Sequence, residues 1–172
     1  MRKSMSLAVA ALLAVGVFAV RAGSQAKAAG GFGQLKALVG TWEAKTEEGT
    51  TINTIRLVSN DSAIEETFQS KGGGMHAQQM VTMYTPDGAR MAMTHYCSMG
   101  NQPHMQTEAV SADQREFDFS FTGAGNLSDE KAPHMHHMTL KIEDADHFTE
   151  TWTMTGGAQE HTAVFHFVRT KA

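Results

Sequence analysis

The stretch "REFDFSFTG", residues 115–123, indicates the fold class most directly, because apolar and polar residues alternate along it. Successive side chains of a β-strand point to opposite faces, so Phe117, Phe119 and Phe121 share one face and the polar residues share the other. A strand with one apolar and one polar face is typical of an antiparallel sheet that covers a core on one side. We therefore expect a strand here, with the three phenylalanines pointing inward.

The same period of two recurs over most of the chain, interrupted by turn sequences such as "TPDG" at 85–88. Helical periodicity is nearly absent, so the chain is expected to be all-β. The alternation predicts strands at 41–48, 51–59, 63–70, 76–84, 89–97, 104–111, 115–122, 134–143, 147–155 and 160–169.

One short helical turn is expected before the first strand, in "FGQLKALVG" at 32–40. In that stretch Phe32, Leu35 and either Leu38 or Val39 share a face, and the glycine that follows is a natural helix stop.

About ten short strands joined by tight turns form an antiparallel meander, and closing it into a barrel leaves no exposed sheet edge. We therefore predict an antiparallel up-and-down β-barrel of about 8–10 strands with a short N-terminal helical turn, over residues 29–172. A two-sheet sandwich is the alternative. A barrel of this size leaves room for side chains and one small ligand.

The N-terminal residues have the layout of a secretory signal peptide. Arg2 and Lys3 precede an apolar run at 7–20, and Ala26 and Ala28 fit an A-x-A cleavage pattern. The run is shorter than the roughly 20 residues of a membrane-spanning helix, although a retained N-terminal anchor is the alternative. We expect residues 1–28 to be a signal peptide, so that the domain is periplasmic or secreted after cleavage near Ala28.

The charge balance excludes nucleic acid as an expected partner. The chain has 172 residues and a formal net charge of −4, without a basic cluster. The charged residues of the predicted signal peptide are all basic, so its loss would make the domain more acidic. Stable membrane insertion is not expected either, and the oligomeric state is not indicated. Cys97 is the only cysteine, so an internal disulfide is excluded.

The stretch "LVGTWEAK" at 38–45 resembles the opening strand of the calycin barrels, which include lipocalins, fatty-acid-binding proteins and nitrobindins. In these families a Gly-x-Trp motif follows a short helical turn, and an arginine of the last strand packs across the tryptophan. Gly40, Trp42 and Arg169 stand where the resemblance places those residues. The resemblance implies a calycin-like barrel with these three residues in a structural role at its closed end. It does not transfer a ligand, because one barrel fold hosts many functions.

The segment that begins with "MYTPDG" at 83–88 and continues through "MTHYCSMGNQPHM" at 93–105 resembles a group of bacterial secreted proteins with no settled activity. This resemblance supports the barrel fold and an exported location more than any particular function.

Alternation also predicts which side chains face the lumen. Met91, Met93, His95 and Cys97 share one face of their strand, and "HMHHM" at 134–138 divides into three inward residues and two outward ones, Met135 and His137. Glu150 is a carboxyl group on an otherwise apolar face, which requires a partner, a proton or a wet opening. We expect the ligand-binding residues to be Met91, Met93, His95, Phe117, Phe119, His134, His136, Met138, Glu150 and Trp152.

A lumen rich in methionine, phenylalanine and tryptophan suits a small, largely apolar molecule, because methionine side chains adapt to an irregular guest. Binding of such a molecule by an exported barrel is the favoured hypothesis, and it needs no cofactor. A ligand-free domain that serves in envelope interactions is an alternative.

A soft-metal site is a further alternative, because imidazole, thioether and thiolate ligands together suit copper. Its ligands would be Met91, Met93, His95, Cys97, His134, His136 and Met138, provided that the two rows face each other. A haem carrier is also compatible with an aromatic lumen.

Catalysis is not favoured. Cys97, His95 and Glu150 are residue types of a nucleophile, a base and an orienting group, but no oxyanion loop accompanies them.

Overall fold

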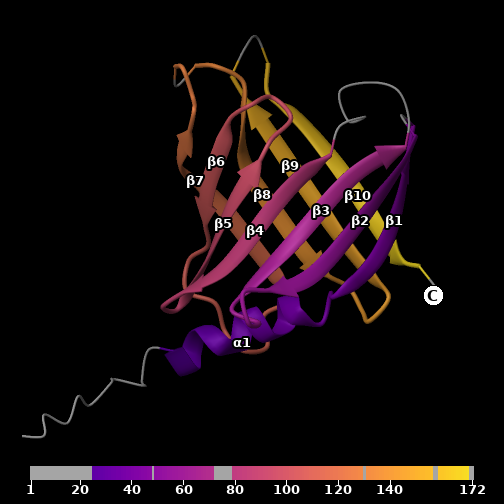
Figure 1. Ribbon diagram of the computed structural model, residues 1–172, viewed down its shortest axis with the longest axis vertical. Coiled ribbons are helices and arrows are strands. Elements are labelled where there is room, and N and C mark those ends of the chain that lie inside the picture. The colour runs from indigo at the N-terminus through magenta and orange to yellow at the C-terminus, as the bar shows by residue number, and fades with distance from the viewer. Residues whose placement is uncertain (1–24, 48, 72–78, 130, 157–158, 171–172) are drawn as a thin grey trace, which may run out of the picture.

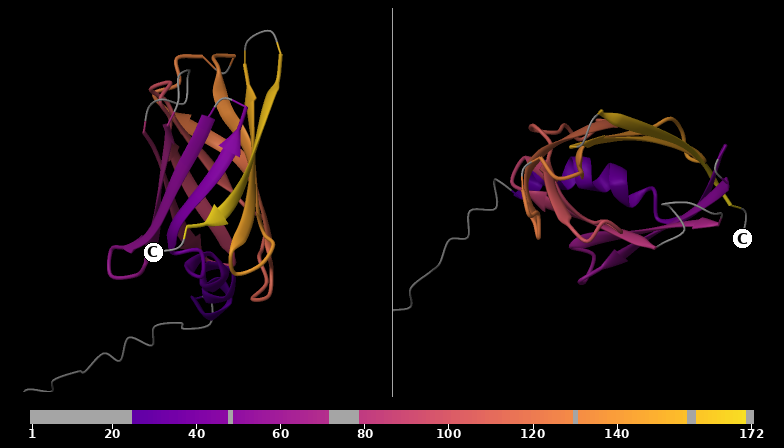
Figure 2. Two further views of the ribbon diagram at one scale, coloured as in Figure 1. Left: turned by 90° about the vertical axis from the view of Figure 1, so that its right-hand side faces the viewer. Right: turned by 90° about the horizontal axis from the view of Figure 1, so that it is seen from above.

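The structure, a computed structural model, describes residues 25–47, 49–71, 79–129, 131–156 and 159–170. It is a closed barrel of ten antiparallel strands with one helix across its lower end (Figures 1 and 2). The predicted fold class is therefore confirmed, and the sandwich alternative is wrong. Nearly all of the predicted signal peptide lies outside the described residues, so export stays a prediction.

Each strand pairs with its neighbours in the sequence, and β1 closes the ring by pairing with β10. The strands are β1 (Gly40–Thr46), β2 (Gly49–Val58), β3 (Ala63–Lys71), β4 (Met80–Asp87), β5 (Arg90–Tyr96), β6 (Gln102–Gln106), β7 (Glu116–Gly125), β8 (His134–Ile142), β9 (His147–Thr155) and β10 (His161–Arg169).

Two predicted strands differ most from the structure at their ends. The expected strand at 104–111 is β6, which ends at Gln106, because the next residues turn under the barrel and Val110 becomes buried there. The expected strand at 76–84 is β4, which continues to Asp87 through the hairpin pair Asp87–Arg90. The expected start of that strand lies outside the described residues.

The helix is longer, and ends earlier, than the sequence indicates. Helix α1 spans Gln25–Lys36, and a turn of i to i+3 hydrogen bonds carries the chain on to Val39. Phe32, Leu35 and Leu38 are buried against the barrel, whereas Val39 is exposed. The predicted apolar face is confirmed with Leu38 as its third member, but the predicted range 32–40 is wrong, because the helical turns begin well before the apolar residues that suggested them.

The closed end is fixed by the contact between Trp42 and Arg169, which are also register partners of β1 and β10. The guanidinium carbon lies 3.9 Å from the indole ring centroid, and the guanidinium donates to the carbonyls of Ala37, Val39 and Ala145. The planar guanidinium group lies over the indole ring and at the same time directs its N–H groups at three carbonyl oxygens. The ammonium group of lysine has no such plane and cannot make this set of contacts. The predicted structural pairing of the two residues is confirmed.

Gly40 makes this contact sterically accessible. Its φ of 146° is a conformation that other residues rarely adopt, and a Cβ at this position would lie 2.5 Å from Nη1 of Arg169. The glycine of the Gly-x-Trp motif is therefore required by the close approach of the guanidinium group.

The lower half of the barrel is solidly packed. Its interior is filled by large side chains with almost no exposed surface, among them Met91, Phe117, Phe119, Phe148 and Phe167. Phe148 stacks on Phe167 with ring centroids 4.8 Å apart. This packing leaves the upper half, away from α1, as the part of the lumen that holds a cavity.

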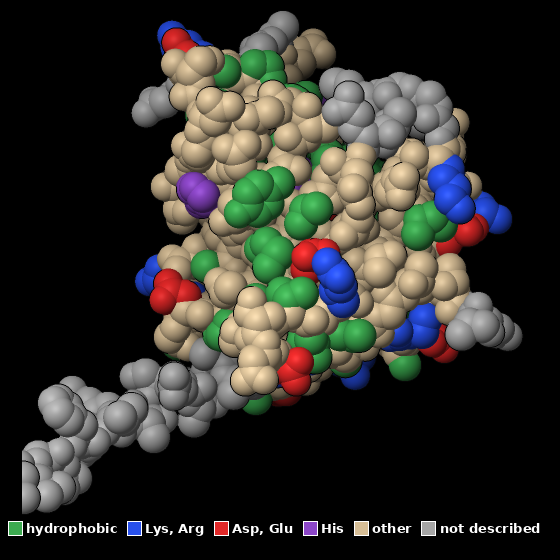
Figure 3. Space-filling view, in the orientation of Figure 1, with side chains coloured by type: hydrophobic (Ala, Val, Ile, Leu, Met, Phe, Trp, Pro, Cys, Tyr) green, Lys and Arg blue, Asp and Glu red, His purple; other side chains and the backbone are tan. Residues whose placement is uncertain are grey.

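The outer face carries separate apolar side chains among polar ones, and Figure 3 shows several of them over β4 and β5. Tyr96 is 49% exposed there and borders a shallow hollow together with Met83. Within the described residues, no helix has the length and apolar character needed to cross a membrane.

The docking of α1 can be tested at Gly31, where an added Cβ would lie 2.5 Å from Cγ2 of Val110. We expect Gly31→Ala to lower the free energy of unfolding by about 1–3 kcal/mol through overpacking, despite the better helix propensity of alanine. Urea unfolding measures the change. Gly33→Ala is the matched control, because nothing lies within 4 Å of its added Cβ.

A double-mutant cycle with Val110→Ala isolates the clash. The loss caused by Gly31→Ala should shrink or reverse once Val110 is shortened. Equal stability of the Gly31→Ala and Gly33→Ala variants would show that α1 does not sit against Val110 as described.

Candidate functional site

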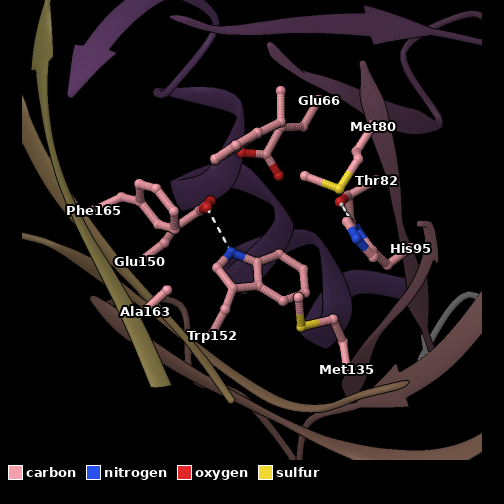
Figure 4. A pocket seen from close by; sticks show the side chains of 10 residues that line it. Glu66, Met80, Thr82, His95, Met135, Glu150, Trp152, Ala163 and Phe165 are labelled. Atoms are coloured by element: carbon pink, nitrogen blue, oxygen red, sulfur yellow. Dashed lines mark hydrogen bonds between the residues drawn. The ribbon is translucent and has the colours of Figure 1, made fainter. Parts of the chain in front are cut away.

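A cavity lies in the upper half of the lumen (Figure 4). The free space between its side chains, counted out to the mouth, is about 380 Å³. It is lined by Glu66, Phe68, Met80, Thr82, His95, Met135, Glu150, Trp152, Ala163 and Phe165. Met135 and Ala163 are only partly buried and mark its more open side. A compact ligand fits this space, and a bulkier one requires the flexible methionines to move.

Two carboxyl groups from opposite parts of the sheet face this cavity: Glu66 on β3 and Glu150 on β9, with exposed fractions of 1% and 0%. Glu66 accepts a hydrogen bond of 2.5 Å from the hydroxyl of Tyr84 and another from the side-chain amide of Asn53. The carboxyl oxygens of Glu66 therefore have two protein donors.

Glu150 is held differently. The indole N–H of Trp152 donates to its Oε2 at 2.9 Å, and its carboxyl group also shares a hydrogen bond with that of Glu66. Burial and the negative charge of Glu66 raise the pKa of Glu150 well above its usual range, and the Trp152 bond offsets only part of this rise. Glu150 is therefore the protonated member of the pair.

His95 on β5 is the third polar group at the cavity. Its Nδ1 lies 2.9 Å from the Thr82 hydroxyl, its ring centroid lies 4.6 Å from that of Trp152, and its Nε2 has no partner among the described residues. Burial lowers the pKa of His95 to about 4, so the imidazole is neutral at physiological pH. It can donate or accept one hydrogen bond through Nε2 without adding charge.

The remaining walls are apolar. Phe68 and Phe165 meet edge to face with ring centroids 4.9 Å apart, and Met80 and Met135 complete the lining with Trp152. The site is therefore an apolar, aromatic cavity with a small number of buried polar groups, which is the usual composition of a small-molecule site.

A β-bulge in β8 decides which residues of "HMHHM" reach the cavity. The register with β9 shifts between Met135 and His137, so strict alternation fails at His136. Met135 lines the cavity and His136 is exposed, which corrects the predicted outward Met135 and inward His136. His134 is buried as expected, with its ring 4.7 Å from Phe121, but it is not part of the cavity wall.

The other predicted residues separate into two groups. His95, Glu150 and Trp152 line the cavity, as the sequence indicates. A second group is buried inside the barrel, which confirms the inward direction, but none of its members is part of the cavity wall: Met91, Met93, Cys97, Phe117, Phe119 and Met138.

Sequence reasoning missed Glu66, which is the charged centre of the site. Its strand alternates Ile64, Glu66 and Phe68 on the buried face, so an acidic residue between two apolar ones was the available signal. Met80 and Thr82 were missed because both faces of β4 carry apolar residues, which left the direction of that strand undecided.

The two predicted rows of soft metal ligands are separated in part by the same bulge, because it leaves His136 at the surface. Burial raises the pKa of the Cys97 thiol, so the sulfur is protonated at neutral pH. No three His, Cys, Asp or Glu side chains converge on one point in the part of the chain that the structure describes. The copper and haem alternatives stay predictions.

The predicted catalytic grouping of Cys97, His95 and Glu150 is also divided. His95 and Glu150 lie on the cavity, whereas Cys97 is not in its lining.

No protein-family model matches this chain, and no curated protein matches its sequence significantly. The function is therefore inferred from the geometry of the cavity.

Proposed function

We propose that this protein binds a small, largely apolar molecule carrying one polar group, inside the upper half of the barrel. The observation that carries the proposal is the pair of fully buried carboxyl groups, Glu66 and Glu150, on the wall of an otherwise largely apolar cavity. A buried polar group whose hydrogen bonds are incomplete costs about 1–3 kcal/mol, and a polar group of a ligand that completes them removes that cost.

The apolar walls supply the rest of the binding free energy. Burial of apolar surface contributes about 25 cal/mol per Å², and the lining offers two phenylalanines, two methionines and a tryptophan for this purpose. A ligand of about eight heavy atoms that fills the cavity is expected to bind with a Kd of about 1 mM or tighter.

The relation to calycins and the exported location are part of the same proposal. The contact of Arg169 with Trp42, beside Gly40, supports the calycin relation. Export rests on the N-terminal sequence pattern. An exported barrel with a small cavity fits the role of a binding protein for a compact molecule outside the cytoplasm.

Fluorescence titration tests the proposal, because Trp152 lines the cavity and Trp42 lies at the closed end. With benzyl alcohol as the probe, we expect a saturable change in emission of the wild-type protein, retained in Trp42→Phe. Trp152→Phe should show no change in emission. Native mass spectrometry of the purified protein would reveal a co-purified organic ligand.

Filling the cavity provides a second test. Ala163 lies at the cavity and its neighbour Val164 is exposed on the outer face. Ala163→Leu should weaken benzyl alcohol binding at least tenfold, whereas Val164→Leu should leave it unchanged. Equal binding by the two variants, or no saturable binding to the wild type, would contradict a binding function at this cavity.

A further inference from the structure

The carboxyl groups of the pair accept few hydrogen bonds from the protein. Tyr84 and Asn53 donate to Glu66, and Trp152 donates to Glu150. Nearby polar atoms without a partner among the described residues are Oδ1 of Asn53 and Nε2 of His95. Once Glu150 is ionised it no longer donates to Glu66, so the two carboxylates have more acceptor positions than these donors can fill, and a ligand rich in N–H donors would satisfy them.

The part of the chain that the structure describes also places no lysine or arginine beside the pair. None of the described residues that line the cavity is lysine or arginine. Arg56 follows Asn53 by three residues on β2, but it is exposed and forms its ion pair of 2.7 Å with Glu65 on the outer face. Burying an ionised carboxyl beside a second carboxyl without a cation is costly, and a cationic ligand would offset that cost.

We infer that the polar end of the ligand is a protonated amine, held between the carboxyl groups of Glu66 and Glu150. The inference rests on the proposed binding function and names the ligand class for the same cavity. The aromatic walls suit it, because the faces of Trp152, Phe68 and Phe165 attract a cation as well as an apolar body.

Binding of the amine releases a proton. In the free protein Glu150 is a carboxylic acid. When R–NH₃⁺ enters, that acid gives its proton to solvent, and the ammonium donates N–H bonds to the resulting carboxylate. No covalent bond of the ligand changes. The other titratable groups facing the pair are Tyr84 on β4, which donates to Glu66, and His95 on β5, which is neutral.

The inference is tested with two probes of nearly the same shape, benzylamine and benzyl alcohol. Isothermal titration calorimetry is run at pH 7 in phosphate and in HEPES, whose ionisation enthalpies differ, so the protons exchanged on binding can be counted. We expect benzylamine to bind at least tenfold more tightly than benzyl alcohol and to release close to one proton per molecule bound. Benzyl alcohol should release none.

Variants assign the proton. Glu150→Gln should abolish proton release and reduce benzylamine affinity at least tenfold, while benzyl alcohol affinity stays within about twofold. Glu65→Gln is the matched control, because Glu65 is adjacent to Glu66 but bonded to Arg56 on the outside. It should leave both probes and the proton count unchanged. Circular dichroism confirms that each variant is folded.

The outcomes separate the two proposals. Equal or tighter binding of benzyl alcohol, or benzylamine binding without proton release, would overturn the amine inference and leave the binding function standing. Failure of both probes to bind the wild type would overturn both.

Discussion

Replacing Glu150 by glutamine is expected to make the barrel more stable, by an amount that grows with pH. The carboxyl group is fully buried beside Glu66, and its pKa in the folded protein is well above the usual value. The native state then binds the proton more tightly than the unfolded state, so stability falls as pH rises above the unfolded pKa, by about 1.4 kcal/mol per pH unit until the native pKa is reached. Glutamine keeps an acceptor for Trp152 and has no proton to lose.

His95 contributes the opposite slope at lower pH. Its pKa is lowered from 6.5 to about 4 on folding, so the native state binds this proton less tightly than the unfolded state. The resulting stability, about 3 kcal/mol, is present above pH 6.5 and is lost as pH falls towards 4. The slopes of Glu150 and His95 oppose each other between about pH 4.5 and 6.5. Above that range only the Glu150 slope remains.

Urea unfolding at pH 5, 6, 7 and 8 measures both effects. The stability of Glu150→Gln minus that of the wild type should increase with pH, by about 1.4 kcal/mol per pH unit as long as the pH stays below the native pKa of Glu150. Glu65→Gln serves as the control for loss of an acidic side chain at an exposed ion pair, and its difference from the wild type should stay nearly constant. A constant difference for Glu150→Gln would mean that Glu150 is ionised in the folded protein.

Trp42→Ala should be among the most destabilising single substitutions in this protein, with a loss of about 3–5 kcal/mol. The indole is fully buried, contacts Phe148 edge to face at 4.7 Å and donates to the Leu38 carbonyl at 2.8 Å. Its removal leaves a cavity and also takes away the ring over which the Arg169 guanidinium lies. Since domains of this kind are stable by about 5–15 kcal/mol, the variant would lose much of its stability.

Denaturant unfolding compares the stability of Trp42→Ala with that of two other variants. Trp42→Phe keeps an aromatic ring without the N–H donor and should lie between the wild type and the alanine variant. Tyr96→Ala removes an exposed aromatic side chain and should change stability by less than about 0.5 kcal/mol. Similar losses at positions 42 and 96 would contradict the role of Trp42 at the closed end.

The fold could be predicted from the sequence because each strand carries its own signal. Strict alternation, as in Phe117 and Phe119, fixes both the strand and its inner face, and turn residues fix its ends. The helix was less predictable. Its first turns carry alanine and glycine but no large apolar residue, so the pattern indicated only the part near Phe32 and Leu35.

The site was harder to predict than the fold, for two physical reasons. One inserted residue, His136, changes the face that its neighbours occupy, and a bulge of this kind has no reliable sequence signal. In addition, alternation predicts whether a side chain points into the barrel, but not where along the barrel axis it lies. Met91 and His95 share a face of β5, yet only His95 is high enough to reach the cavity.

The seam between β1 and β10 has a consequence for how the barrel forms and opens. Only two register pairs join these strands, whereas β2 and β3 share nine, and the Arg169 bond to Val39 that supports the seam joins residues 130 positions apart. Contacts of such long sequence separation form late and make folding slow. The ring is therefore expected to close last and to part first at this seam, so amide hydrogen exchange should be faster along β1 and β10 than along β2 and β3.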